Sequence, residues 1–139
     1  MRSREKPTVE QPYWVIVRSV DEMEAFYISK LPAIREAARQ CGYAVGLHGS
    51  MRRDLDLMAI PWVEPYSTPD ALADAIMRAA CGFGREHTYW TDKPNGRIAT
   101  SLPVCWCEWE GVYEIKSIGH IDLSVMLPSN YLKAQQGAK

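Results

Sequence analysis

The feature that most constrains this chain is an alternation of acidic and apolar residues that follows a Gly-Ser pair, within residues 47–57. Side chains of a β-strand point alternately to its two faces. The alternation therefore predicts a strand over about residues 54–60, with Asp54 and Asp56 on one face and Leu55 and Leu57 on the other. Two neighbouring carboxylates repel each other unless a cation neutralises them. The pair is consequently a candidate site for Mg²⁺, which binds a few carboxylates together with substrate phosphates and water.

An acidic pair is also common on a solvated edge strand, and two further features favour a site over that alternative. Gly49 and Ser50 form a predicted turn whose backbone N–H groups could face a phosphate. A second apolar run, residues 120–127, carries Asp122 near its start. Three carboxylates on neighbouring strands would form a two-metal site for phosphoryl transfer.

The Gly-Ser turn, the Asp-x-Asp strand and the later strand with one aspartate resemble the nucleotidyltransferase superfamily, which has the DNA-polymerase-beta-like fold. In particular, the chain looks like the minimal single-domain members found in phages and prophages, over residues 21–128. The resemblance implies one or two Mg²⁺ ions and a bound nucleoside triphosphate. The residues that it assigns are Gly49 and Ser50 for nucleotide phosphates, Asp54 and Asp56 for metal, and Asp122 to complete the triad.

The connection between the Gly-Ser turn and the first aspartate departs from the family, which has a longer stretch here. Only Met51, Arg52 and Arg53 intervene, and this shortening bears on where the turn lies relative to the carboxylates. Both arginines are candidate nucleotide-binding residues, because a guanidinium binds phosphate through two parallel hydrogen bonds. The alternative is a salt bridge with Asp54 or Asp56 when no metal is bound.

Other side chains are weaker candidates for the same site. Lys93 and Arg97 flank a predicted turn, where they contact either substrate phosphates or solvent alone. His48 and His120 precede the Gly-Ser turn and the last strand, and a structural role is the favoured interpretation of both. Trp62 is interpreted as a packing residue in preference to one that stacks on a base.

A long helix is predicted ahead of the Gly-Ser turn. Ser19 and Glu22 have capping-box spacing, and apolar residues recur with helical periodicity over residues 23–41. Pro32 should kink or divide this helix, because proline lacks an N–H and clashes with the preceding turn. Gly42 is a natural helix stop.

The remaining elements follow the Asp-x-Asp strand. A second helix begins near Ser67 or Thr68, with Pro69 in its first turn. Residues 92–96 have strong turn chemistry, and residues 105–117 form either a long hairpin arm or a loop. Besides the Asp-x-Asp strand, the predicted strands are residues 44–47, 85–91, 97–104 and the run that carries Asp122.

These elements predict an α/β fold with a mixed β-sheet and two main helices packed mostly on one face, as in a nucleotidyltransferase. The predicted domain occupies residues 13–133, between disordered tails at residues 1–12 and 134–139. Residues 13–17 are either an added edge strand or a segment packed on the core.

Length and charge limit the classes of protein. The chain has 139 residues, which suits a single domain with its own core. Its 16 basic and 17 acidic residues nearly balance, so charge does not indicate nucleic-acid binding, although a local site is compatible with it. No apolar run has the length of a membrane span and no signal peptide is recognisable, so we expect a cytoplasmic protein without membrane contact.

The sequence therefore favours a metal-dependent nucleotidyltransferase-like enzyme that transfers a nucleoside monophosphate from a nucleoside triphosphate to a hydroxyl. Asp122 would hold a second metal or accept the proton of the attacking hydroxyl. No residue pattern identifies the acceptor. The alternative is a noncatalytic phage or prophage accessory or interaction protein on the same fold, with the aromatic and acidic segment at residues 105–113 as a contact surface, for instance in a homodimer.

Overall fold

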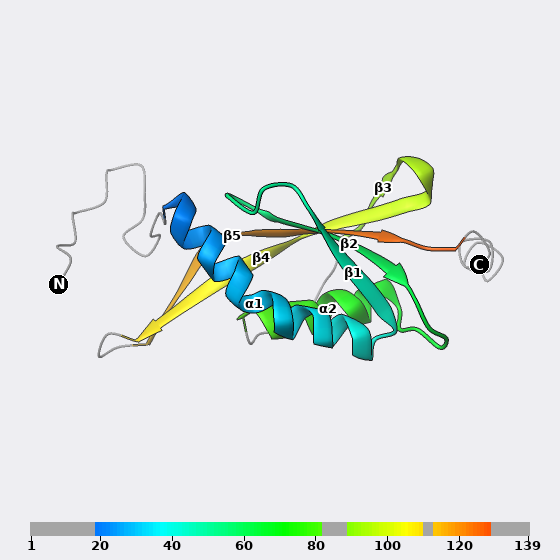
Figure 1. The fold of residues 1–139 in the computed structure, drawn as a ribbon, viewed down its shortest axis with the longest axis horizontal. Helices are drawn as coiled ribbons and strands as arrows, with labels where there is room; N and C mark the ends of the chain where they lie inside the picture. The colour runs from blue at the N-terminus through cyan, green and yellow to red at the C-terminus, as the bar shows by residue number, and fades with distance from the viewer. Residues whose placement is uncertain (1–18, 82–88, 110–112, 129–139) are drawn as a thin grey trace.

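The computed structural model describes residues 19–81, 89–109 and 113–128, which form an α/β arrangement of two α-helices and one five-stranded sheet (Figure 1). The predicted tails and the segment at residues 13–17 lie outside the described residues. The elements in chain order are α1 (Val20–Gln40), β1 (Tyr43–His48), β2 (Leu55–Pro61), α2 (Pro69–Cys81), β3 (Thr91–Lys93), the 3₁₀ turn η1 (Pro94–Gly96), β4 (Arg97–Trp109) and β5 (Tyr113–Met126).

The sheet is mixed, as predicted, and its strand order is β1-β2-β5-β4-β3. β2 and β5 are parallel neighbours at the centre of the sheet, and the other pairs of strands are antiparallel. Both helices lie on the same side of the sheet (Figure 1). The predicted fold class, an α/β mixed sheet with two helices on one face, is therefore confirmed.

The hydrophobic core fills the space between the helices and the covered face of the sheet. The period-2 alternation predicted for β2 is observed, because Leu55, Leu57 and Ala59 are fully buried while Asp56 and Met58 are only half-buried. Burying each large side chain contributes roughly 1.5–3 kcal/mol. The other fully buried large side chains come from both helices and from β4 and β5: Tyr27, Ile34, Leu72, Ile76, Leu102, Val104, Ile121, Leu123 and Val125.

Helix α1 begins and ends at the predicted residues. The Ser19 hydroxyl accepts a hydrogen bond from the Glu22 N–H at 3.1 Å, and the Glu22 carboxylate accepts one from the Ser19 N–H at 3.0 Å. The helix ends before Gly42, whose φ of +89° suits glycine. Of the two predicted effects of Pro32, a kink or a division of the helix, division is wrong, since α1 is continuous through it. Pro32 is exposed and Ile28, whose carbonyl loses its partner, is 49% exposed, so water can bond that carbonyl.

Helix α2 also begins as predicted. The Thr68 hydroxyl accepts a hydrogen bond from the Ala71 N–H at 3.2 Å, and its carbonyl accepts one from the Leu72 N–H at 3.0 Å. Pro69 takes the first helical position, where no N–H is required. Thr68 therefore caps the helix that covers the β4 side of the sheet.

The segment at residues 105–117, for which a hairpin arm and a loop were alternatives, belongs to a hairpin. β4 and β5 pair as far as Trp109 and Tyr113, and the hairpin extends past α1 (Figure 1). On the other side of β4, β3 is a short strand, and residues 82–88, which include most of the predicted strand 85–91, lie outside the described residues. The predicted turn is η1, which connects β3 to β4 and in which Asn95 has a φ of +68°.

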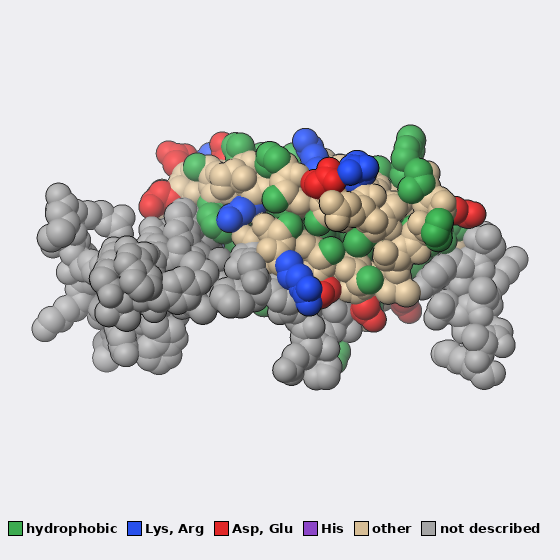
Figure 2. Space-filling view, turned by 90° about the horizontal axis from the view of Figure 1, so that it is seen from below, with side chains coloured by type: hydrophobic (Ala, Val, Ile, Leu, Met, Phe, Trp, Pro, Cys, Tyr) green, Lys and Arg blue, Asp and Glu red, His purple; other side chains and the backbone are tan. Residues whose placement is uncertain are grey.

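The outer surface of the helices carries charges of both signs. Figure 2, seen from the side on which the helices lie in Figure 1, shows basic and acidic side chains beside one another among apolar ones. Ion pairs on this surface join Arg39 to Glu36 and Arg78 to Asp74. Neither described helix is long and apolar enough to span a membrane.

Candidate functional site

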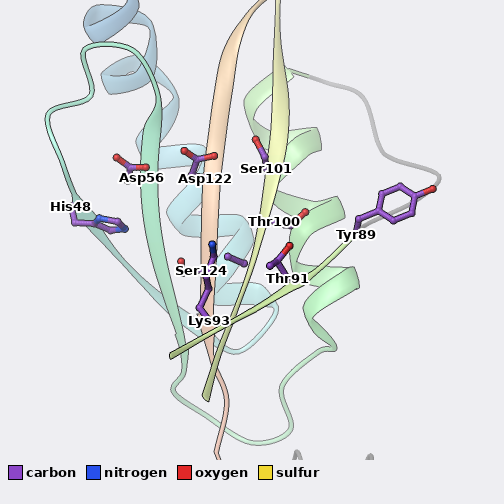
Figure 3. Close-up of a pocket in the computed structure, with 10 residues that line it drawn as sticks. His48, Asp56, Tyr89, Thr91, Lys93, Thr100, Ser101, Asp122 and Ser124 are labelled. Atoms are coloured by element: carbon purple, nitrogen blue, oxygen red, sulfur yellow. The ribbon is translucent and has the colours of Figure 1, made fainter. Parts of the chain in front are cut away.

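The uncovered face of the sheet carries a row of polar side chains that crosses four strands. His48 of β1 lies opposite Asp56 of β2, Asp56 lies opposite Asp122 of β5, and Asp122 lies opposite Ser101 of β4. Side chains directly opposite each other on neighbouring strands share a face and lie about 5 Å apart at Cβ. Figure 3 shows Asp56 and Asp122 side by side in the middle of this row.

The surroundings of Asp56 favour the protonated form of its carboxyl group. Burial raises the pKa of the Asp56 carboxyl, and the negative charge of Asp122 together with a hydrogen bond to it raises this pKa further, while His48 opposes the shift. Two carboxyl groups at such a distance cannot both ionise easily without a cation. A metal ion bound beside the two carboxylates would relieve their repulsion.

Asp54 lies just before β2, whereas the strand was predicted to begin with it. Its negative charge contributes to the raised pKa of Asp56 and to that of Tyr27, so Asp54 lies within electrostatic reach of the site. Within residues 19–81, 89–109 and 113–128, however, no group of three or more His, Cys, Asp or Glu side chains has an arrangement that could hold a metal ion. The site in this structure is thus a pair, Asp56 and Asp122, with Asp54 nearby.

The Gly-Ser turn lies directly against the carboxylate pair. Gly49 has a φ of +76°, and a Cβ atom at this position would collide with Oδ2 of Asp56. Glycine adopts this conformation without strain and leaves room for the Asp56 carboxylate. The Ser50 hydroxyl accepts a hydrogen bond from the Arg52 N–H at 3.3 Å, which stabilises the turn locally. The structure therefore brings Gly49 to Asp56 despite the short connection.

The two arginines of the connection have different surroundings. The Arg52 guanidinium lies 3.8 Å from a carboxylate oxygen of Asp21 and 3.6 Å from one of Glu24, both on α1. These are its ion pairs in the described part of the chain, and the alternative in which Arg52 balances Asp54 or Asp56 is not what the structure shows. Arg53 has an exposed side chain, and its carbonyl accepts a hydrogen bond from Tyr27.

An open pocket of about 570 Å³ lies over the uncovered face (Figure 3). The carboxylates of Asp56 and Asp122 belong to its wall, and the Lys93 ammonium lies further along the sheet (Figure 3). The pocket therefore has a negative part and a positive part. Its lining residues are His48, Asp56, Tyr89, Thr91, Lys93, Ala99, Thr100, Ser101, Asp122 and Ser124.

Some of these lining residues were not predicted from the sequence. Tyr89, Thr91 and Ser101 carry no recognisable motif, although Ser101 precedes the buried Leu102 in an alternating strand. That alternation would have placed Ser101 on the face opposite the core. Its position beside Asp122 follows only from the pairing of β4 with β5.

The weaker candidates are divided between the site and its surroundings. His48 and Lys93 line the pocket. Arg97 donates a hydrogen bond to the Ser124 hydroxyl at 3.4 Å, next to the pocket wall. His120 contributes a carbonyl that accepts from Tyr27 at 3.5 Å. Trp62 follows the far end of β2, is 77% exposed and does not line this pocket, so the interpretation as a packing residue is wrong.

Comparison of the chain with protein-family models, with curated proteins and with solved structures gives no match. The fold and the site define an α/β protein with an acidic pair on the uncovered face of a mixed sheet, beside a glycine-containing turn.

Proposed function

We propose that this protein is a metal-dependent nucleotidyltransferase-like enzyme, which transfers a nucleoside monophosphate from a nucleoside triphosphate to a hydroxyl acceptor. The observation that carries the proposal is the register of β2 and β5, in which Asp56 lies directly opposite Asp122 on the uncovered face. The two residues are far apart in the sequence, and the resemblance to nucleotidyltransferases assigns metal to each of them. In the sheet they are neighbours.

The residues present fit a Mg²⁺ ion that is completed by its substrate. Mg²⁺ is commonly held by one or two carboxylates together with phosphate oxygens and water. Asp56 and Asp122 supply the carboxylates, and burial together with the neighbouring charge of Asp122 raises the pKa of the Asp56 carboxyl. Asp54 is close enough to add its charge. When bound, the ion would neutralise charge on the phosphates of the nucleotide.

The polarity of the pocket suits a nucleoside triphosphate. Its phosphates would extend from the metal held by Asp56 and Asp122 toward the Lys93 ammonium, which offsets their remaining negative charge. The backbone at Gly49 and Ser50 lies at the same end as Asp56 and would contact the phosphates. The short connection is compatible with this role, because Gly49 already contacts Asp56.

The chemical step requires a base and charge stabilisation more than covalent work by the protein. A carboxylate oxygen of Asp122 accepts the proton of the acceptor hydroxyl, whose oxygen forms the new bond to the α-phosphorus. The bond from the α-phosphorus to the bridging oxygen breaks, and pyrophosphate leaves. The exposed guanidinium of Arg53 is a further candidate for contact with the phosphates.

Nucleotide binding tests the proposal directly. Thermal melts are recorded with Mg²⁺ and each of ATP, GTP, CTP and UTP, for the wild type and for Asp54→Asn and Asp56→Asn. We expect at least one nucleotide to raise the melting temperature of the wild type only. Glu64→Gln is the matched control, because it removes one exposed carboxylate beyond the opposite end of β2 and should keep the shift.

A wild type that no nucleotide stabilises would contradict the enzyme and favour the noncatalytic phage or prophage interaction protein. A shift that persists in Asp56→Asn would place the nucleotide outside this pocket. Where a nucleotide binds, release of pyrophosphate in the presence of hydroxyl-bearing candidates would identify the acceptor.

A further inference from the structure

Tyr27 is the residue that connects α1 to the backbone beside the acidic site. Its side chain is 1% exposed, and its hydroxyl donates a hydrogen bond to the Arg53 carbonyl at 2.7 Å. The His120 carbonyl lies 3.5 Å from the same hydroxyl. Arg53 immediately precedes Asp54, and His120 is two residues before Asp122. One phenol group thus contacts both segments that deliver carboxylates to the site.

The packing around this hydroxyl leaves little freedom. A Cβ atom at Gly119 would collide with the Tyr27 hydroxyl and would lie 3.2 Å from the Arg53 carbonyl oxygen. Helix α1, the connection before β2 and strand β5 therefore converge at one point. Removing the donor from this partly buried carbonyl costs free energy, so the hydrogen bond holds the connection in place.

The electrostatic environment places the same group near the carboxylates. Burial raises the pKa of the Tyr27 phenol to about 12, and the charges of Asp54, Asp122 and Asp56 add to this shift. The phenol consequently stays neutral and remains a hydrogen-bond donor at neutral pH. It lies on the covered side of the sheet, whereas Asp56 and Asp122 are half-buried on the other side.

We infer that Tyr27 is a positioning residue, which fixes Asp54 relative to Asp122 because its hydroxyl donates a hydrogen bond to the Arg53 carbonyl and lies against the His120 carbonyl. This inference rests on the proposed function, because it assigns Tyr27 to the metal site of that enzyme. Partners that orient metal ligands typically change metal affinity about 10–100-fold when they are removed. Asp54 can join the pair Asp56 and Asp122 only if the connection that carries it is held close.

The chain offers a matched control for this hydrogen bond. The Tyr43 hydroxyl donates to the Ser67 carbonyl at 2.7 Å, and the Tyr43 side chain is 3% exposed. Tyr43→Phe and Tyr27→Phe thus each remove one buried hydroxyl from a carbonyl of a connecting segment, at the same distance. Of the two tyrosines, Tyr27 is the one bonded to the residue that precedes Asp54. We therefore expect both variants to lose stability and Tyr27→Phe alone to lose metal affinity.

The experiment is isothermal titration calorimetry of the full chain with Mg²⁺ alone and with Mg²⁺ in the presence of ATP. We expect Tyr27→Phe to weaken Mg²⁺ binding about tenfold relative to the wild type. Tyr43→Phe should bind Mg²⁺ as the wild type does. Equal affinities in the two variants would overturn the inference and leave the proposed function intact. A wild type that binds no Mg²⁺ under either condition would overturn both.

A measurement on the wild type covers the case in which Tyr27→Phe does not fold. The protein is labelled with carbon-13 at Cζ of tyrosine and titrated with Mg²⁺ and ATP. We expect the Tyr27 resonance to move on binding, because its hydrogen-bonded carbonyls belong to the segments that carry the metal ligands, while the Tyr43 resonance stays in place. A Tyr27 resonance that does not move at saturating Mg²⁺ would overturn the inference.

Discussion

The two faces of β2 and β5 differ in burial and in chemistry, although the same strands supply both. On the covered face, Leu55 and Leu57 of β2 and Leu123 of β5 have no exposed surface. On the uncovered face, Asp56 and Asp122 are half-buried and line a pocket. Alternate residues of one strand thus contribute either to stability or to the candidate site.

The difference teaches how a small domain can hold two carboxylates side by side. Their repulsion opposes folding, and the adjoining apolar residues supply the opposing free energy on the other face. A rigid pair of central strands then fixes the separation of the carboxylates. If this interpretation is correct, substitutions on the two faces should separate stability from binding.

The largest effect is expected on the covered face. Leu57→Ala removes a fully buried side chain and leaves a cavity, so the free energy of unfolding should fall by about 2–5 kcal/mol. Met58→Ala, on the half-buried opposite face, is the control and should lose much less. Urea denaturation measures both. Equal losses would show that the two faces do not differ in their contribution to stability.

A smaller effect is expected where the covering helix begins. Ser19→Ala removes one half of the capping box of α1, which should lower the free energy of unfolding by about 1 kcal/mol. Mg²⁺ binding should not change, because Ser19 does not line the pocket that holds the carboxylates. Ser29→Ala is the control within the same helix, since its hydroxyl donates a hydrogen bond to the Phe26 carbonyl one turn earlier. A loss no larger than that of Ser29→Ala would contradict the importance of the cap.

The sequence predicts those features of this comparison that depend on neighbouring residues. The alternation at residues 54–57 predicts the two faces of β2, and the spacing of Ser19 and Glu22 predicts the start of α1. The expectation that Pro32 divides the helix is wrong because burial of Leu31 and Ile34 on either side of it offsets the free-energy cost of the lost hydrogen bond.

Features that depend on the tertiary fold could not be predicted in this way. The resemblance led us to expect Asp122 beside Asp56, but local spacing alone could not, because the pairing depends on the strand order in which β5 lies between β2 and β4. Tyr27 has the spacing of an ordinary core residue of a helix, and only the fold supplies the carbonyl that its hydroxyl bonds. The acidic partners of Arg52 lie on α1, far from it in the sequence.

The folded protein should be more stable when the uncovered face carries less negative charge. Asp56→Asn is expected to raise the free energy of unfolding without metal, by less than the loss in Ser19→Ala, because both carboxylates are partly exposed. The folded-state pKa of Asp56 is raised above its usual 3.8, so its contribution to stability is greatest below that pH and falls as pH rises through the folded-state pKa.

The gain in Asp56→Asn should therefore be present at neutral pH and absent at about pH 3, where the wild-type carboxyl is protonated too. Urea denaturation with a chelator and low salt measures it, with Glu64→Gln, which removes an exposed carboxylate beyond the other end of β2, as the control. A stability loss at neutral pH would mean that Asp56 is paired with a cationic side chain and that the carboxylates do not repel each other in the folded protein.

The smallest expected effect concerns Arg52. Its ion pairs are with residues of α1, although it lies two residues before Asp54 in the sequence. A double-mutant cycle of Arg52→Ala with Glu24→Gln should give a coupling of about 0.2–1 kcal/mol, because the two side chains are 3.6 Å apart and both are partly exposed. The cycle of Arg52→Ala with Asp56→Asn should give no coupling, since Asp56 is not among the ion-pair partners of Arg52. Denaturation without metal measures both cycles. Coupling to Asp56 in place of Glu24 would mean that Arg52 neutralises the acidic pair in solution, and the uncovered face would then lack the excess negative charge on which the metal site depends.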